Sequence, residues 1–217
     1  QDNPTEPLRR AQEFRDELRT EIDLLTPEWI STWSSRKAVT DQPDPVFLVG
    51  FPRSGTTLLD TLLMGHPKVT VLEEQPPLNI VDNAIGGLAA LPALGQEDIA
   101  QARRDYFAEV QKIEDVPISN LLIDKSPLFL HKLPLIQLLF PNARFILAMR
   151  HPCDVLLSCF MSNFRLNSAM SNFLRLEDAA QFYDLSFQHW QHSCELFPAN
   201  IHLIRYEKLV EDVESEV

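Results

Sequence analysis

The stretch PVFLVGFPRSGTTLL, residues 45–59, carries the most informative local pattern in the chain. Its first part, residues 46–49, is a short apolar run, which predicts a buried strand. Residues 50–55 interrupt the run, and Thr56 begins a helix-like segment. Backbone N–H groups at the start of a helix lack intrahelical partners and lie at the positive end of the helix dipole. The stretch therefore predicts a strand, a tight loop and a helix that bind a phosphate-like anion.

The glycine spacing of this loop is that of a P-loop, with four residues between Gly50 and Gly55. Thr56, however, stands where an NTP-binding loop carries lysine. Arg53 is the nearest cation, and its guanidinium presents a planar fork to phosphate or sulfate oxygens. An ordinary strand-turn-helix corner with a surface arginine is the alternative. The glycines, Arg53 and the hydroxyls of Thr56 and Thr57 together favour the anion site.

Four segments resemble, in the same order along the chain, those of sulfotransferases that use 3′-phosphoadenosine 5′-phosphosulfate (PAPS). They are PRSGTT at 52–57, DKSP at 124–127, RFILAMRHPCDVLLSCF at 144–160 and IRYEKL at 204–209. The resemblance covers about residues 45–217 and is strongest to bacterial sulfotransferases often joined to tetratricopeptide repeats, with tyrosylprotein sulfotransferases more distant. It implies an α/β, P-loop-like three-layer fold. It also implies transfer of a sulfuryl group from PAPS to a hydroxyl or amine acceptor, with PAP as the product.

The resemblance also assigns roles to individual residues. The positions that correspond to donor contacts are Arg53, Ser54, Gly55, Thr56, Thr57, Arg150, Ser158 and Tyr206. The loop residues would hold the 5′-phosphosulfate, and Arg150 with Ser158, eight positions later, the 3′-phosphate. Lys125 would stabilise the leaving oxygen, together with Arg53. Three alternatives without a functional role stay open: Lys125 is solvated, Arg150 forms an ion pair with Asp154, and Tyr206 only packs.

Glu74 is the candidate base that removes the acceptor's proton. Tyrosylprotein sulfotransferases place two consecutive glutamates after a His-Pro pair and use the second as base; His66-Pro67 and Glu73-Glu74 match this arrangement. We expect partial burial or the neighbouring Glu73 to raise the pKa of Glu74. A solvated acidic pair, or His66 as the base, is the alternative. Gln75-Pro76 departs from the threonine-arginine pair of those enzymes, so the acceptor, a small molecule or a peptide, stays open.

The remaining sequence predicts an α/β domain with a short helical extension. Apolar runs at 69–72, which is expected as a second buried strand, and at 121–124, 144–148 and 201–204 join residues 46–49 as about five strands. Helical stretches separate them, which predicts a mostly parallel sheet with helices on both faces. Residues 43–217 are assigned to the sulfotransferase domain, without its C-terminal part, and residues 1–42 to an N-terminal helical extension. That extension would be the place of tetratricopeptide repeats or of a partner protein.

The overall charge and composition exclude several classes of protein. Nineteen Lys and Arg residues against 31 Asp and Glu give a formal net charge of −12, which argues against nucleic-acid or anionic-membrane binding. No apolar run approaches the ~20 residues of a membrane span. Three cysteines without zinc-type spacing argue against a disulfide framework, which favours a reducing, cytoplasmic location. All three are expected as small buried residues. His189 and His192 are expected off the buried face of their helix, where no metal role is predicted.

Two other functions compete with sulfotransfer. A P-loop kinase or NTPase is favoured by Asp124, which ends an apolar strand as a magnesium-binding carboxylate does. Thr56 in the lysine position argues against this reading. A noncatalytic nucleotide-binding interaction module is the second rival. Sulfotransfer by Arg53 and Lys125 would need no metal ion, because these cations supply the charge that magnesium provides in kinases.

Overall fold

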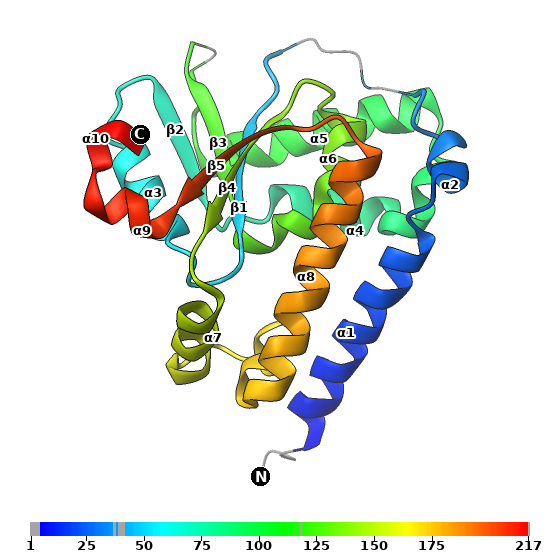
Figure 1. Ribbon diagram of the computed structural model, residues 1–217. Helices are drawn as coiled ribbons and strands as arrows, with labels where there is room; N and C mark the ends of the chain where they lie inside the picture. Colours follow the sequence, from blue (N-terminus) through cyan, green and yellow to red (C-terminus); the bar gives the residue numbers. More distant parts are fainter. Residues whose placement is uncertain (1–4, 37, 39–41, 118, 217) are drawn as a thin grey trace.

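The computed structural model describes residues 5–36, 38, 42–117 and 119–216. Its centre is a sheet of five strands in the order β2-β3-β1-β4-β5, and every neighbouring pair is parallel (Figure 1). The strands are β1 (Val46–Gly50), β2 (Val69–Glu73), β3 (Leu121–Lys125), β4 (Arg144–Met149) and β5 (Asn200–Arg205). The predicted parallel five-stranded sheet is therefore confirmed.

Helices connect all of these strands. The α-helices are α1 (Thr5–Leu24), α2 (Pro27–Ser31), α3 (Thr56–Leu63), α4 (Pro77–Ile85), α5 (Gln96–Ile113), α6 (Leu133–Leu139), α7 (Pro152–Met161), α8 (Leu176–Leu196), α9 (Tyr206–Glu211) and α10 (Val213–Glu216). Three 3₁₀ segments are η1 (Leu88–Ala93), η2 (Pro127–Lys132) and η3 (Met170–Leu174). No helix within the described residues is long and apolar enough to cross a membrane.

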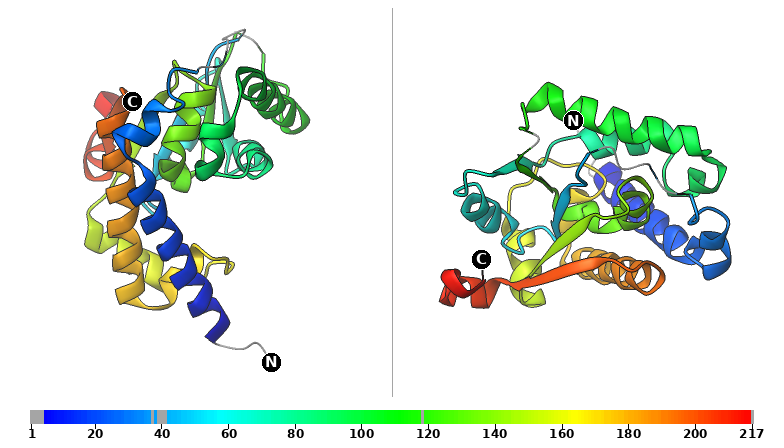
Figure 2. Two further views of the ribbon diagram at one scale, coloured as in Figure 1. Left: turned by 90° about the vertical axis from the view of Figure 1, so that its right-hand side faces the viewer. Right: turned by 90° about the horizontal axis from the view of Figure 1, so that it is seen from above.

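The alternation of side chains along β1 divides the core into two layers. Val46 and Leu48 pack with Leu59 of α3 and Leu209 of α9, whereas Phe47 belongs to the larger layer beneath α4, α5, α6 and α8. Figure 2 shows helices on both sides of the sheet. All of β1 is buried because strands pair with it on both edges and helices cover both faces.

The two outer strands are less buried than β1. Val69 and Val71 of β2 are half-buried, and His202 and Leu203 of β5 are exposed. The prediction of a second buried strand at 69–72 is therefore wrong in burial, although the strand itself is present. Each of these strands lies at an edge of the sheet and has a strand neighbour on one side only. An apolar run does not distinguish such an edge strand from a central one.

Helix α1 lies along α8, as Figures 1 and 2 show from two directions. Ala11 and Leu18 lie on its buried face. Arg15 joins that buried face: its side chain is 4% exposed, and its Nη2 lies 3.0 Å from Oδ1 of Asp178 in α8. The assignment of residues 1–42 to an extension stays a prediction, and residues 1–4, 37 and 39–41 lie outside the described part.

Contact with α1 also changes which face of α8 is buried. His189 is fully buried, and its Nε2 lies 3.3 Å from Oε2 of Glu21 in α1. The prediction that His189 lies off the buried face is therefore wrong, because the apolar pattern of α8 does not reveal a polar contact with a distant helix.

Ser126 makes no side-chain cap, and the segment after it is a 3₁₀ helix, with Pro134 in the first turn of the following α6. One smaller expectation needs correction. Cys153 is exposed, so the cysteines are not all buried.

Candidate active site

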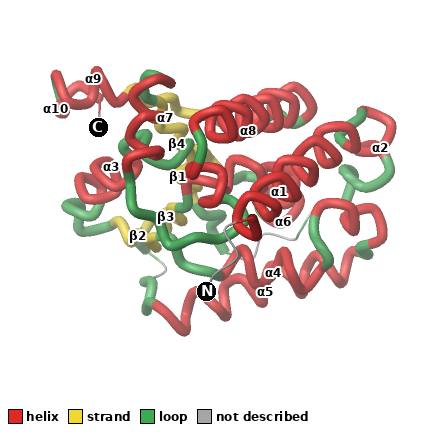
Figure 3. The backbone as a smooth tube through the Cα atoms, turned by 90° about the horizontal axis from the view of Figure 1, so that it is seen from below, coloured by secondary structure: helices red, strands yellow, loops and turns green. Residues whose placement is uncertain are grey.

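The five strands end at one edge of the sheet, and each delivers a candidate residue there. β1 leads into the loop 51–55, β2 into Glu74, β4 into Arg150 and β5 into Tyr206, while Lys125 is the last residue of β3. Figure 3 looks onto this edge, with α3 on one side of the strands and α1 and α8 on the other. The carboxyl ends of parallel strands are where open α/β sheets bind ligands, and β1 pairs with both β3 and β4, so the chain order reverses beside it.

A cavity of about 880 Å³ opens at this edge. From the predicted set it is lined by Arg53, Gly55, Thr56, Thr57, Glu74, Arg150 and Tyr206. The structure thus brings together residues that are up to 153 positions apart in the sequence, from Arg53 to Tyr206. Ser54, Lys125 and Ser158 lie behind the lining, within reach of residues that form it.

The loop between β1 and α3 has an unusual backbone. Arg53 has φ 70° and Gly55 has φ 94°, both in the left-handed region. A non-glycine residue there costs about 1–2 kcal/mol, and such strain gathers at functional sites. At Gly55 a Cβ atom would lie 2.4 Å from Cδ2 of Tyr206, so only glycine lets the loop approach that ring.

Three predicted donor contacts meet around this loop. Nε of Arg53 donates a hydrogen bond to Oγ of Ser158 at 3.1 Å, and Nη1 of Arg150 reaches the carbonyl oxygen of Arg53 at 3.4 Å. The guanidinium of Arg150 lies 4.6 Å from the ring centroid of Tyr206, a cation–π contact. Tyr206 therefore both packs against Arg150 and lines the cavity. Nε of Arg150 is buried without a hydrogen-bond partner among the described residues.

Lys125 is buried beneath three carboxylates. Its Nζ lies 3.1 Å from Asp60 Oδ2, 3.2 Å from Glu73 Oε1 and 3.1 Å from Glu74 Oε1. The Lys125 side chain is 0% exposed, so the reading as a solvated lysine is wrong. Burial lowers the pKa of Lys125, but the Asp60 contact and the charge of Glu74 outweigh it and hold that pKa above its ordinary value.

Glu74 differs from the expectation in one respect. Its side chain is 59% exposed, so the expected partial burial is wrong. Its φ of 49° lies in the left-handed region, as that of Arg53 does, and its backbone N–H donates to the carbonyl of Lys125 at 2.7 Å. This backbone turn directs Glu74 into the cavity lining, whereas Glu73 is not part of that lining.

Asp60 is a residue of this cluster that the sequence does not reveal. It follows Thr56 by one helical turn within α3, in the apolar segment TTLLDTLL, and its side chain is 1% exposed. A lone carboxylate among leucines is the available signal, since buried charges require partners. Its partner, Lys125, is 65 positions away.

Asp124, on which the kinase alternative rested, faces the core. Its carboxylate is fully buried and Oδ2 accepts a hydrogen bond from the Tyr106 hydroxyl at 2.9 Å. Burial raises the pKa of Asp124 to about 7, although the Tyr106 bond works in the opposite direction. Asp124 thus holds Tyr106 of α5 against the sheet and does not line the cavity.

His66, the alternative base, and His151, the residue after Arg150, both lie outside the cavity lining. His66 is exposed, and its Nδ1 accepts a hydrogen bond from the backbone of Lys68 at 3.2 Å. His151 caps α7, and its backbone N–H donates to Glu207 at 2.8 Å. Neither lines the cavity. Within the described part of the chain, no three His, Cys, Asp or Glu side chains form a group that fits a metal ion.

Sequence reasoning missed the wall of the cavity opposite the loop. Lining residues outside the predicted set include Phe14, Glu17 and Glu21 of α1 and Asn79, Asp82 and Asn83 of α4. Nothing in the amphipathic pattern of α1 indicates that its charged face borders a cavity.

Comparisons with known proteins agree with the geometry. The family model described as the sulfotransferase family matches residues 45–217. An uncharacterised protein of Aquifex aeolicus is 28% identical over 222 residues, which cover 95% of this chain and 28% of that protein. The nodulation protein NoeE of Sinorhizobium fredii is 33% identical over 128 residues, 52% of this chain and 30% of that protein. Human protein-tyrosine sulfotransferase 1 is 26% identical over 155 residues, 65% of this chain and 38% of that protein.

Among solved structures, the sulfotransferase domain from the curacin biosynthetic pathway superposes with a TM-score of 0.50 at 23% identity, covering 80% of this chain and 71% of that domain. This likeness supports the fold. The chain spans less than two fifths of the curated relatives named above. The family match covers the strand-loop-helix unit and all four segments singled out in the sequence, and the kinase alternative is not favoured. The chain belongs to the sulfotransferase family.

Proposed function

We propose that this chain transfers the sulfuryl group of PAPS to a hydroxyl or amine acceptor. The observation that carries the proposal is the shared cavity, in which the loop after β1 meets Arg150, Tyr206 and Glu74. The donor supplies an activated sulfuryl group on a phosphate leaving group. The protein's part is to position this group and to stabilise charge on the leaving oxygen.

The loop after β1 would bind one end of the donor, and Arg150 together with α7 would bind the other. Arg53, Ser54, Gly55, Thr56 and Thr57 would hold the 5′-phosphosulfate, at the N-terminus of the eight-residue α3. Arg150 and Ser158 would hold the 3′-phosphate. These residues fit an anion, because Nε of Arg150 is buried with no hydrogen-bond partner among the described residues and needs one. Tyr206 would contact the nucleotide beside Arg150.

Lys125 and Glu74 would act on opposite sides of the transfer. Lys125 would stabilise the leaving oxygen, and Glu74 would accept the acceptor's proton. In the structure Nζ of Lys125 donates a hydrogen bond to Oε1 of Glu74 at 3.1 Å. Glu74, more than half exposed, is the partner that can move. Release of Lys125 by Glu74 would free both for their roles at once.

The test begins with donor binding. PAP and ATP are titrated into the full chain by calorimetry, with and without magnesium. PAPS is then supplied with a panel of phenols, alcohols and amines in the presence of EDTA, and sulfated product is measured. We expect PAP to bind more tightly than ATP and product to form without a divalent metal. Tighter binding of ATP with magnesium would support a kinase-like protein, and PAP binding without any transfer would support a noncatalytic module.

A further inference from the structure

Much of the cavity lining lies outside the donor loop and comes from other helical segments, and these residues are treated as a second part of the cavity. α1 contributes Glu17 and Glu21, α4 contributes Asp82, and η2 contributes His131 and Lys132. Apolar side chains complete this part: Phe14, Leu18, Leu128, Phe129 and Phe164. The space therefore suits a ligand with an apolar body and a polar group near the carboxylates.

The charges in this part are unbalanced. Nζ of Lys132 lies 2.7 Å from Asp82 Oδ2. Burial lowers the pKa of Lys132, but Asp82, and after it Glu21 and Glu17, raise it above its ordinary value, so all three carboxylates act on one ammonium. Arg165, on an exposed loop, is the other cation of the lining outside the donor site. Without Glu74, which pairs with Lys125, the three carboxylates there exceed the two cations by one.

His131 provides a second, independent indication of a ligand. It lines the cavity and is 5% exposed, yet its Nε2 has no hydrogen-bond partner in the described part of the chain. Burial, followed by the nearby His189 and Lys132, holds the pKa of His131 well below its ordinary value, so the imidazole is neutral. A buried polar atom without a partner in a cavity wall is satisfied by a ligand or by water.

We propose that this part of the cavity is the acceptor site and that it selects an acceptor bearing a cationic amine. The inference rests on the proposed function, because an acceptor must lie beside the donor. Arg53 and Arg150 line the donor end, where an anionic donor would neutralise them, whereas Glu17, Glu21 and Asp82 leave the other end acidic. Helix α1 is then the element that determines specificity.

Three para-substituted phenols whose side groups are cationic, neutral and anionic provide the probes: tyramine, p-cresol and 4-hydroxyphenylacetate. Each is titrated by calorimetry into the full chain, with and without saturating PAP. Tyramine is expected to bind about tenfold or more tightly than 4-hydroxyphenylacetate, with p-cresol between them, because the acidic lining favours a cationic side group on the shared phenol ring and disfavours an anionic one.

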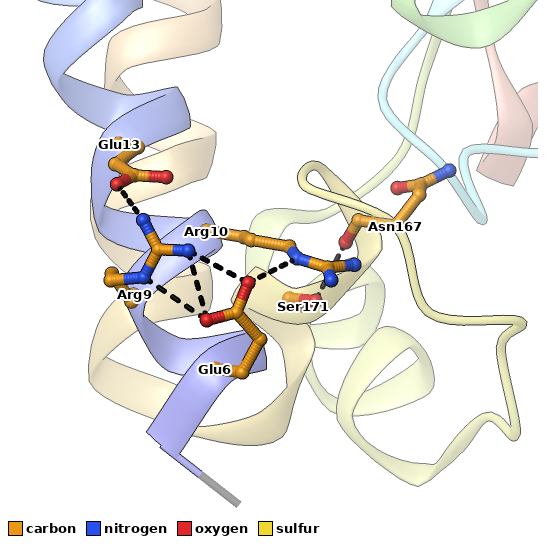
Figure 4. A network of polar contacts seen from close by, with 6 residues as sticks. All are labelled: Glu6, Arg9, Arg10, Glu13, Asn167 and Ser171. Carbon is orange, nitrogen blue, oxygen red and sulfur yellow. Dashed lines mark hydrogen bonds and ion pairs between the residues drawn. The ribbon is translucent and has the colours of Figure 1, made fainter. Parts of the chain in front are cut away.

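Glu17→Gln is expected to weaken tyramine binding about 3- to 10-fold and to leave p-cresol unchanged. Glu13→Gln is the matched control on the same helix, because Glu13 lies outside the cavity lining and its Oε1 accepts from Nη1 of Arg9 at 2.5 Å (Figure 4). Glu21→Gln is a second test, with thermal unfolding as a check because Glu21 also contacts His189.

Equal affinities for the three phenols, a preference for the carboxylate, or unchanged tyramine binding by Glu17→Gln would each overturn the inference. Failure of the proposed function has a different signature, which is absence of PAP binding or of sulfate transfer from PAPS. The titrations without PAP report the charge preference in either case.

Discussion

Glu73 and Glu74 make nearly equal contacts with Lys125, but only Glu74 lines the cavity. Substituting each glutamate in turn therefore distinguishes an electrostatic effect on Lys125 from a role in proton transfer. Glu74→Gln is expected to lower kcat about 10²- to 10⁴-fold, the usual contribution of a general base, with PAP affinity unchanged. Glu73→Gln is the control and should lower kcat far less. Steady-state kinetics and PAP titration of both variants measure this, and a near-normal kcat for Glu74→Gln would place the base elsewhere.

Asp60 is expected to act through Lys125. Asp60→Asn removes one of the charges that raise the pKa of Lys125, while keeping the size of the side chain. The pKa of Lys125 should fall, so turnover should decline at lower pH on the alkaline side than in the wild type. The pH profile of kcat/KM measures this shift, which a purely structural role of Asp60 would not produce. Superimposable profiles would show that Asp60 does not tune Lys125.

Asp124 makes stability depend on pH in a predictable direction. Burial raises its pKa from the ordinary 3.8 to about 7, so the folded state holds this proton more tightly than the unfolded chain does. Its contribution to stability is present below pH ~4 and is lost as pH rises to about 7. Asp124→Asn does not titrate, so its Tm relative to the wild type should increase between pH 4 and pH 8. A Tm difference that stays constant across this range would contradict the raised pKa.

At the scale of elements, Arg15 links α1 to α8 and η3. Its guanidinium contacts Asp178 at 3.0 Å and Asn172 at 2.5 Å; Arg15 and Asn172 are buried, and Asp178 is half-buried. Arg15→Ala leaves Asp178 without its cation and is expected to cost about 3 kcal/mol, or roughly 6–12 °C in Tm. Arg19→Ala, which removes an exposed pair with Asp16, should cost less than about 1 kcal/mol. Thermal unfolding compares the two, and equal losses would mean that the Arg15 pair does not anchor α1.

The elements that could be predicted from the sequence are those whose pattern is local. Local structure is predicted correctly where a few neighbouring residues determine it. Examples are the apolar residues of β1, the glycines of the loop and Pro152 at the start of α7. The contact of Asp60 with Lys125 and the packing of α1 against α8 join segments far apart in the chain. Local periodicity carries no information on such contacts. The pattern of α8 therefore predicts the wrong face for His189, and the pattern of α1 does not reveal that this helix lines the cavity.

At the scale of the whole molecule, the parallel sheet brings the site residues together. Residues from the ends of all five strands reach one cavity or its immediate support because every strand points the same way. Cations lie at the donor end, around Arg53 and Arg150, even though the chain as a whole has a formal net charge of −12. The proposed anion binding would thus depend on local placement and not on overall charge.

The central claim is that this edge of the sheet binds the 3′-phosphate of PAPS through Arg150. Its most direct test is calorimetric titration of PAP and of adenosine 5′-phosphosulfate, which lacks that phosphate, into the wild type and Arg150→Ala. Arg144→Ala, an exposed arginine at the opposite end of β4, is the control. Arg150→Ala should lower PAP affinity about 10- to 150-fold and leave adenosine 5′-phosphosulfate nearly unchanged. Equal losses for both ligands, or no loss for PAP, would contradict it.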